Sequence, residues 1–138
     1  AAQTRSIVVP NSKGEGDVQD MALRAVAKAS VTHFDVLARS EHAAVCDVRP
    51  VSGRMHQIRV HAEHEGHPLA GDTQYGLALQ PTPRCRRLLL HAHSLRIRHP
   101  RQGGLLRITA PPPPAFWCEA EALGLSANSF ASVSGGVL

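Results

Sequence analysis

Two pairs of short apolar runs, each pair interrupted by a polar turn, constrain the fold of this chain most strongly. Residues 31–38 (VTHFDVLA) and 43–49 (AAVCDVR) are rich in β-branched side chains, and a short polar stretch separates them. Residues 92–98 (AHSLRIR) and 105–109 (LLRIT) alternate apolar and polar side chains on either side of the turn HPRQGG. Runs of this kind that flank a turn are typical of β-hairpins. The sequence therefore predicts two antiparallel hairpins.

One helix is predicted between the two hairpins. It spans residues 55–65, with Ser52 as the cap at its start and Gly66 where a C-terminal cap belongs. Residues 18–29, after a Gly-rich loop over residues 11–17, fit a short helix or equally an irregular connection. Several antiparallel strands with few helices place the chain in the α+β class, with a mixed or antiparallel sheet.

The remaining segments are predicted to be mostly irregular. Residues 77–87 form a loop that contains proline and arginine, and the run APPPPAFW ends the regular structure because proline donates no backbone hydrogen bond. One or two helical turns follow at residues 118–123. We expect one domain over residues 1–123, a flexible tail over residues 124–138, and an aliphatic core. The expected core residues are Leu37, Val45, Val48, Ile58, Leu89, Leu95, Ile97, Leu106 and Ile108.

Composition limits the class of protein. A chain of 138 residues, 43% of them hydrophobic, can form one domain with a modest core. It has no run of about 18 or more apolar residues, so no membrane span is predicted, and the N-terminus lacks the layout of a secretory signal. The odd, widely spaced set of Cys46, Cys85 and Cys118 favours small buried thiols, reduced in an intracellular compartment. Cytoplasm, nucleus and an organelle matrix, such as that of the mitochondrion, all fit.

Positive charge is concentrated in one part of the chain. The formal net charge is +4, and no acidic residue lies between Asp72 and Glu119. The same interval contains seven arginines and three histidines. A segment with a single sign of charge predicts a surface that faces phosphates, and an exposed Arg-rich hairpin without such a partner is the alternative. One Trp and one Tyr leave little scope for stacking on bases.

The segment VSGRMHQIRVH, residues 51–61, concentrates hydrogen-bond donors around the predicted helix. Polar side chains fall on several of its sides at i, i+3 and i+4 spacing, which leaves no clear apolar stripe. Arg54 and Arg59 are permanent cations whose planar guanidinium groups suit phosphate or carboxylate. A solvated helix in which Arg59 pairs with Glu63 is the alternative, and the spacing alone leaves both open.

The longer stretch GRMHQIRVHAEHEGHPLAGDTQYG, residues 53–76, closely resembles the signature of the RluA-type RNA pseudouridine synthases. The segment RLLLHAHSLRIRHPRQGGLLRITAP resembles the family's ending, and ASVTHFDVL resembles the strand before the signature. Together the matched segments cover roughly residues 28–117. This resemblance implies that residues 1–123 are the C-terminal half of a pseudouridine synthase catalytic domain.

The resemblance also implies an activity and its site. Members of the family isomerise uridine in RNA, such as rRNA or tRNA, to pseudouridine without a cofactor, after they flip the uridine out of its stack. A catalytic aspartate in an HRLD-like motif attacks the ribose or takes its proton, and an arginine of the helix pairs with it. By position this arginine is Arg59, while Asp72 and Tyr75 belong to the turn behind the pocket. The predicted substrate- or RNA-binding residues are Arg54, His56, Gln57 and His61 in the signature, and Arg86, Arg87 and Arg98 in the segment without acidic residues.

The catalytic aspartate is missing from the sequence. No HRLD-like context surrounds any of the aspartates, which are Asp17, Asp20, Asp35, Asp47 and Asp72. We interpret the chain as partial and inactive by itself, with Arg59 as the partner of an aspartate outside it. The alternative is a non-catalytic RNA-binding protein that uses a degenerate synthase fold in a ribosomal or pre-ribosomal assembly.

A metal site is a further alternative. His61, His64 and His67 recur every three residues, and His91 and His93 form a possible ligand pair. However, the H-E-x-x-H motif is absent, and His67 lies beyond the predicted helix end, directly before a proline. We therefore predict no metal. The resemblance implies no small-molecule cofactor, and the lack of a long apolar run predicts no membrane partner.

Overall fold

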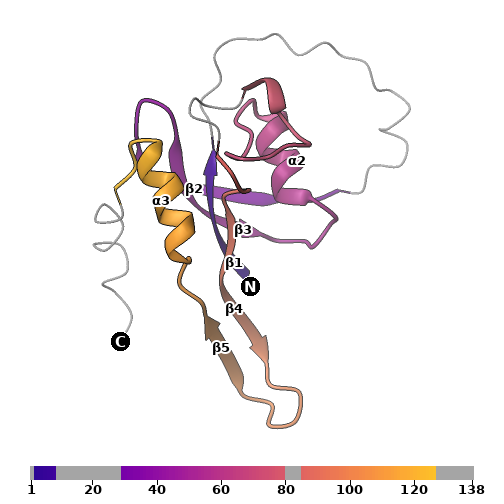
Figure 1. Ribbon diagram of the computed structural model, residues 1–138. Coiled ribbons are helices and arrows are strands. Elements are labelled where there is room, and N and C mark those ends of the chain that lie inside the picture. The colour runs from indigo at the N-terminus through magenta and orange to yellow at the C-terminus, as the bar shows by residue number, and fades with distance from the viewer. Residues whose placement is uncertain (1, 9–28, 80–84, 127–138) are drawn as a thin grey trace.

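The computed structural model contains one five-stranded antiparallel sheet and describes residues 2–8, 29–79 and 85–126 (Figure 1). The strand order is β2-β3-β1-β4-β5, and every neighbouring pair is antiparallel. The strands are β1 (Ala2–Val8), β2 (Thr32–Arg39), β3 (Ala44–Pro50), β4 (Leu90–Arg98) and β5 (Leu105–Thr109). The described helices are α2 (Gln57–His64), the 3-10 turn η1 (Leu77–Leu79) and α3 (Pro114–Ala122). This architecture confirms the predicted α+β class.

Both predicted hairpins are present. Strands β2 and β3 pair with Phe34 opposite Val48, and the register shifts between Val36 and Ala38. Strands β4 and β5 form the second hairpin. Strand β1 lies between the hairpins and joins them into one sheet. The sequence analysis did not predict β1, because its place depends on two partner strands far along the chain.

The helices α2 and α3 cover opposite faces of the sheet. Val45 of β3 belongs to a buried cluster that includes Phe116 of α3, whereas the next residue, Cys46, lines a cavity with Ala62 of α2. Adjacent residues of a strand point to opposite faces. The sheet is therefore the middle layer, and Figure 1 shows α3 on one side of it and α2 on the other.

Helix α2 begins later than predicted, and Ser52 does not cap it. The residue before its first turn is His56, which adopts a left-handed backbone (φ 54°, ψ 19°) and makes no side-chain cap bond. The hydroxyl of Ser52 instead donates to Gln57 Oε1 at 2.8 Å. Gly66 adopts a positive φ of 76° just beyond the helix, which confirms its predicted role in ending α2.

Helix α3 starts inside the proline run, at Pro114 rather than at residue 118. Pro113 precedes it with an extended backbone (φ −68°, ψ 157°). Proline suits a first helical turn because the N–H groups there have no partner within the helix. The prediction that the prolines end regular structure is therefore wrong, and α3 buries Phe116 and Ala120 against the sheet.

The main core lies between α3 and the sheet. Its buried cluster consists of Ala43, Val45, Ala70, Leu89, Phe116, Ala120, Leu123 and Leu125. Full burial confirms the predictions for Val45, Val48 and Leu89, and the half-buried members of the predicted core are Leu37, Ile58 and Leu106. The predictions for Leu95, Ile97 and Ile108 are wrong, since these side chains are 38%, 40% and 48% exposed. They lie on the β4–β5 hairpin, which extends away from the helix-covered part of the sheet (Figure 1).

Several predictions concern residues outside the described part of the chain. These are the loop at 11–17, nearly all of the helix at 18–29 and the middle of the loop at 77–87. The predicted tail at 124–138 needs a correction at its start, because Leu125 is 2% exposed and belongs to the core.

The three cysteines are free thiols that differ in burial. Cys46 is buried and Cys85 packs against the core, and desolvation raises the pKa of each thiol to about 11. Cys118 is exposed on α3, so its predicted burial is wrong. Within the described ranges, no helix is long and apolar enough to cross a membrane.

A substitution at Gly71 measures how tightly the turn after α2 is packed. Its φ is +76°, and a Cβ added there would lie 1.9 Å from the carbonyl oxygen of Arg87. Gly103 has a similar φ of +68° with no atom within 4 Å of its Cβ position, so Gly103→Ala isolates the backbone strain. We expect Gly71→Ala to lower the free energy of unfolding by about 1–3 kcal/mol more than Gly103→Ala in urea titrations. Equal losses would mean that the turn moves away without cost.

Candidate active site

Gln57 anchors the start of α2 to strand β2. Its side chain is buried, and Nε2 donates to the carbonyl of Val31 at 3.0 Å and to Thr32 Oγ1 at 2.9 Å. Its Oε1 accepts the hydroxyl of Ser52 at 2.8 Å and the backbone N–H of Arg54 at 3.1 Å. These four bonds use both amide hydrogens and both acceptor directions. Gln57 therefore orders the loop before α2 and has no donor left for the substrate contact that the resemblance implies.

Arg59 of α2 forms a two-point ion pair with Asp72 of the following turn. Its Nε donates to Asp72 Oδ2 at 2.7 Å, and its Nη2 donates to Oδ1 at 2.8 Å. The side chain is 0% exposed for Asp72 and 16% exposed for Arg59, so the pair lies at the edge of the interior. The alternative in which Arg59 pairs with Glu63 is wrong. Asp72 was predicted only to shape the turn, and its contact with Arg59 was missed.

The ion pair keeps both partners charged. Burial by itself raises the pKa of Asp72, but the Arg59 guanidinium and the backbone N–H groups of Tyr75 and Gln74 hold this pKa below its usual value. Asp72 Oδ1 accepts these two N–H groups at 3.0 and 2.9 Å. The hydrogen bond to Asp72 also raises the pKa of Arg59. Arg59 is therefore a fixed cation whose orientation the turn at 72–75 sets.

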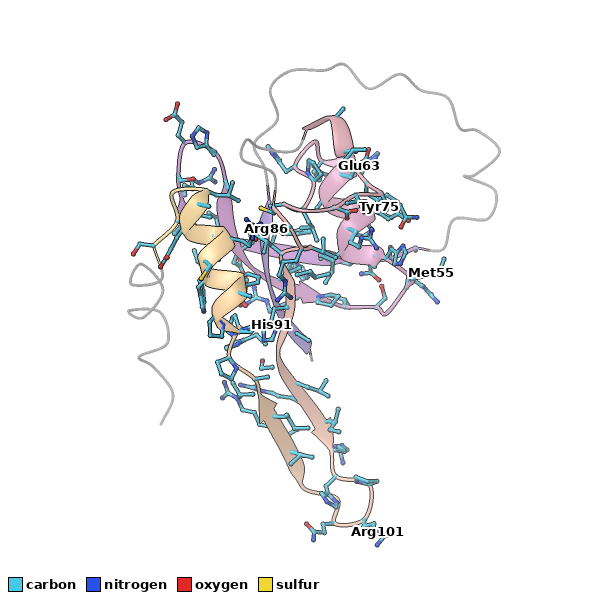
Figure 2. All side chains as sticks on the ribbon, in the orientation of Figure 1. Met55, Glu63, Tyr75, Arg86, His91 and Arg101 are labelled. Atoms are coloured by element: carbon cyan, nitrogen blue, oxygen red, sulfur yellow. The ribbon has the colours of Figure 1, made fainter. Side chains whose placement is uncertain are left out.

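Tyr75 and His56 extend this arrangement. Arg59 Cζ lies 4.8 Å from the centre of the Tyr75 ring, which is a cation–π distance, and Figure 2 shows Tyr75 beside α2. The hydroxyl of Tyr75 lies 3.1 Å from His56 Nδ1, and the two rings meet edge to face. Among the described residues, His56 is the only non-glycine with a positive φ. We call Asp72, Arg59, Tyr75 and His56 the Arg59 cluster.

Two further predicted binding residues lie near α2 in different surroundings. Arg54 is exposed just before the helix and is accessible to a large ligand. His61 is half-buried, and its Nε2 lies 3.0 Å from Ser30 Oγ, next to the start of β2. Across the described residues, no group of three or more His, Cys, Asp or Glu side chains is arranged to hold a metal ion.

The predicted RNA-binding arginines of the C-terminal half lie apart from the Arg59 cluster. Arg86 is exposed before β4, and its backbone N–H donates to Glu119 Oε2 of α3 at 3.2 Å. Arg87 is half-buried and donates to a backbone carbonyl at 3.4 Å, while Arg98 is exposed at the end of β4. Figure 2 shows Arg86 between α3 and α2, and Arg101 at the tip of the hairpin. The predicted site residues are thus divided among α2, the segment before β4 and the hairpin.

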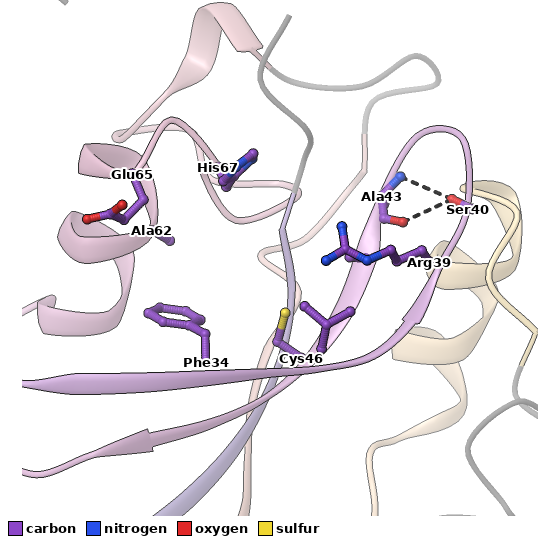
Figure 3. Close-up of a pocket in the computed structure, with 10 residues that line it drawn as sticks. Phe34, Arg39, Ser40, Ala43, Cys46, Ala62, Glu65 and His67 are labelled. Carbon is purple, nitrogen blue, oxygen red and sulfur yellow. Dashed lines mark hydrogen bonds between the residues drawn. The ribbon is translucent and has the colours of Figure 1, made fainter.

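A cavity of about 310 Å³ lies between the β2–β3 face of the sheet and α2 (Figure 3). Phe34, Cys46 and Ala62 form part of its apolar lining, and Arg39 and Glu65 are among its charged residues. None of the predicted site residues lines this cavity. The candidate active site is therefore the Arg59 cluster.

The sequence matches known proteins over part of its length. The family model described as RNA pseudouridylate synthase matches residues 8–64. Ribosomal large subunit pseudouridine synthase C from Yersinia pestis is 49% identical over 89 residues, which are 61% of this chain and 28% of the relative. The protein of the same name from Escherichia coli (strain K12) is 41% identical over 90 residues, again 61% of this chain and 28% of the relative. The chain thus spans about 28% of the length of these curated relatives.

Two solved human structures share the fold. RNA pseudouridylate synthase domain containing 4 has a TM-score of 0.63 at 19% identity, over 89% of this chain and 62% of that chain. RNA pseudouridylate synthase domain containing 1 has a TM-score of 0.59 at 23% identity, over 81% of this chain and 54% of that chain. At these identities the likeness concerns the fold, which is that of a pseudouridine synthase domain. The sequence matches agree with this fold: the chain is similar to RNA pseudouridylate synthases, and its curated relatives support an RluA-type family.

The pKa of Asp72 makes stability depend on pH in a defined direction. Its folded-state pKa lies below the unfolded value of about 3.9, so the pair stabilises the fold above about pH 4, and this stability is lost as the pH falls further. We expect Asp72→Asn to cost about 3–5 kcal/mol of unfolding free energy near pH 7, because it leaves a partly buried guanidinium without its counter-charge. The difference from wild type narrows below about pH 4 in urea titrations. A difference that is constant with pH contradicts this account.

Proposed function

We propose that the chain is part of an RNA pseudouridine synthase in which Arg59 pairs with the reacting carboxylate, on an aspartate outside the chain. The observation that carries the proposal is the two-point bond to Asp72, which holds a permanent cation on the first turn of α2. Two of its relatives are named ribosomal large subunit pseudouridine synthase C, which favours uridines of ribosomal RNA, in a ribosomal or pre-ribosomal particle, as the substrate.

The chemistry of the isomerisation explains the need for such a cation. The bond between N1 of the base and C1′ of the ribose breaks, a bond from C5 to C1′ forms, and a proton leaves C5 while another is added to N1. Atoms and electrons balance without a cofactor. A carboxylate can attack C1′ or take a ribose proton only when it is ionised, yet a dehydrated pocket favours the neutral acid. A guanidinium within about 4–6 Å favours the ionised form and orients it through hydrogen bonds.

The RNA itself is proposed to contact exposed arginines, both next to the Arg59 cluster and apart from it. Arg54 lies beside the Arg59 cluster, Arg86 lies before β4, and Arg98 lies on the hairpin. The absence of acidic residues between Asp72 and Glu119 in the sequence leaves this part of the chain with a single sign of charge. Phosphate contacts of this kind supply affinity that does not depend on base sequence.

The role of Arg59 is tested in a protein that contains this chain together with the segment carrying the reacting aspartate. We expect Arg59→Ala to lower kcat for uridine isomerisation at least about 100-fold, because the carboxylate loses its partner and its orientation. Arg59→Lys keeps the charge but loses the planar fork, so it is also expected to be impaired. Isomerisation is measured by mass spectrometry of the RNA, and RNA affinity by filter binding.

Arg49→Ala is the control for Arg59→Ala, because Arg49 is an arginine in an exposed ion pair with Asp35, away from the cluster. It is expected to leave both activity and RNA affinity unchanged. Normal turnover by Arg59→Ala would remove Arg59 from catalysis. RNA binding without any isomerisation by the wild-type protein would favour a non-catalytic RNA-binding role.

The RNA surface is tested by the salt dependence of binding. Arg86→Gln and Arg98→Gln are each expected to weaken RNA binding and to reduce the slope of log K against log salt by about 0.7–0.9 for every phosphate that the variant no longer neutralises. Arg49→Gln serves as the control and leaves the slope unchanged. A slope equal to that of wild type in either test variant would place that arginine outside the interface.

A further inference from the structure

Arg59 uses most of its hydrogen-bond donors in bonds to other residues of the described part of the chain. A guanidinium has five N–H groups. Nε and Nη2 donate to Asp72 at 2.7 and 2.8 Å, and Nη2 also donates to Gln74 Oε1 at 3.3 Å. Neither N–H of Nη1 has a hydrogen-bond partner among the described residues. The donors that remain therefore lie on a single nitrogen.

Asp72 determines which edge of the guanidinium is occupied. Its side chain is fully buried and accepts the backbone N–H groups of Gln74 and Tyr75, so it cannot follow a movement of Arg59. Gln74 is exposed and its bond is longer, so it can yield to a stronger acceptor. An incoming oxyanion therefore meets Nη1, alone or together with Nη2, and does not reach Nε.

Tyr75 and His56 restrict the plane of the same group. The ring of Tyr75 lies against the guanidinium at 4.8 Å, and His56 Nδ1 lies 3.1 Å from the tyrosine hydroxyl. His56 makes this contact from a left-handed backbone, a conformation that costs a non-glycine residue about 1–3 kcal/mol. Such strain persists where the surrounding contacts require it.

We propose that Asp72, Tyr75 and His56 are positioning residues that present Nη1 of Arg59 to one oxyanion in one direction. That this oxyanion is the reacting carboxylate rests on the proposed function. An unrestrained arginine offers two edges and many rotamers to an acceptor, and most of them place a carboxylate wrongly for reaction. With one edge occupied by Asp72 and one face covered by Tyr75, Arg59 offers a single geometry, which is the condition for productive orientation.

The first test uses the chain itself and does not depend on catalysis. Proton exchange at Nε of Arg59 is measured by arginine side-chain NMR, with the resonance assigned from its loss in Arg59→Lys. We expect exchange to be roughly 10- to 100-fold faster in Asp72→Asn than in wild type, because a charge-assisted bond is lost. The matched control is Asp35→Asn, which removes the carboxylate from the exposed pair with Arg49 and is expected to leave Arg59 unchanged.

Inorganic phosphate then probes which nitrogen is accessible. Adding it to wild type is expected to shift the Nη resonances of Arg59 and leave Nε in place, whereas in Asp72→Asn both shift. Equal Nε exchange in wild type and a folded Asp72→Asn overturns the proposal, as does a phosphate-induced shift at Nε in wild type.

The second test measures kinetics in a protein that also contains the reacting carboxylate. We expect Asp72→Asn to lower kcat about 10- to 100-fold, as the loss of an orienting partner does at other sites, with KM for RNA unchanged. Asp35→Asn is expected to leave both constants at wild-type values. Wild-type kcat in a folded Asp72→Asn enzyme overturns the positioning role.

Because Asp72 is buried, Asp72→Asn can fail to fold, and Tyr75→Leu then carries the test. It removes the ring from the guanidinium face and is expected to lower kcat roughly two- to fivefold with faster Nε exchange. No change in either quantity overturns the proposal. If Nε exchange is slow in the wild-type protein but the protein has no isomerase activity, only the proposed function is contradicted. If the enzyme is active and neither Asp72→Asn nor Tyr75→Leu changes kcat or Nε exchange, only the positioning role is contradicted.

Discussion

The bond between Arg59 and Asp72 is the constraint on which the rest of the candidate site depends. It joins α2 to the turn at 72–75 through a carboxylate that solvent does not reach. Desolvation offsets much of the attraction in a buried ion pair, so the pair adds less stability than the about 3–5 kcal/mol that removal of one partner costs. The pair is therefore better understood as a device for orientation than as a source of stability. It turns a long, flexible side chain into a cation with a defined direction, and Tyr75 takes its place against that cation.

The sheet sets where this pair can form. Gln57 fastens the start of α2 to the start of β2, so the helix that carries Arg59 has a fixed origin. On the other side, Gly71 packs directly against the backbone of Arg87, which places the turn that carries Asp72 next to the segment before β4. Two anchors, one at the start of β2 and one just before β4, thus bring the helix and the turn together. The β4–β5 hairpin, by contrast, is exposed along most of its length and is suited to contact with a large partner.

Local patterns predicted the elements whose signals are local. The two hairpins follow from alternation around polar turns, and Gly66 marks the end of α2 because a positive φ favours glycine. The sequence analysis did not predict three features, and the reason is the same for each. Strand β1 needs partners on both sides, the start of α3 at Pro114 depends on burial of the residues that follow, and the apolar residues of the β4–β5 hairpin lie beyond the reach of α3. Each is decided by contacts between segments distant in the chain, which the period of a pattern does not encode.

The sequence by itself indicated the α+β class and the resemblance to the RluA-type family, and it singled out Arg59, because a dense motif at fixed spacing carries that information within a short window. Only the tertiary structure decided three further features. Arg59 pairs with Asp72, the side chain of Gln57 bonds to Ser52 and Val31, and His56 has a left-handed backbone with its ring against Tyr75. The physical reason is that hydrogen bonds are directional. A hydrogen bond depends on the angle and distance between two groups, and these are set when α2 and the turn after it pack together, not by the identity of either residue alone.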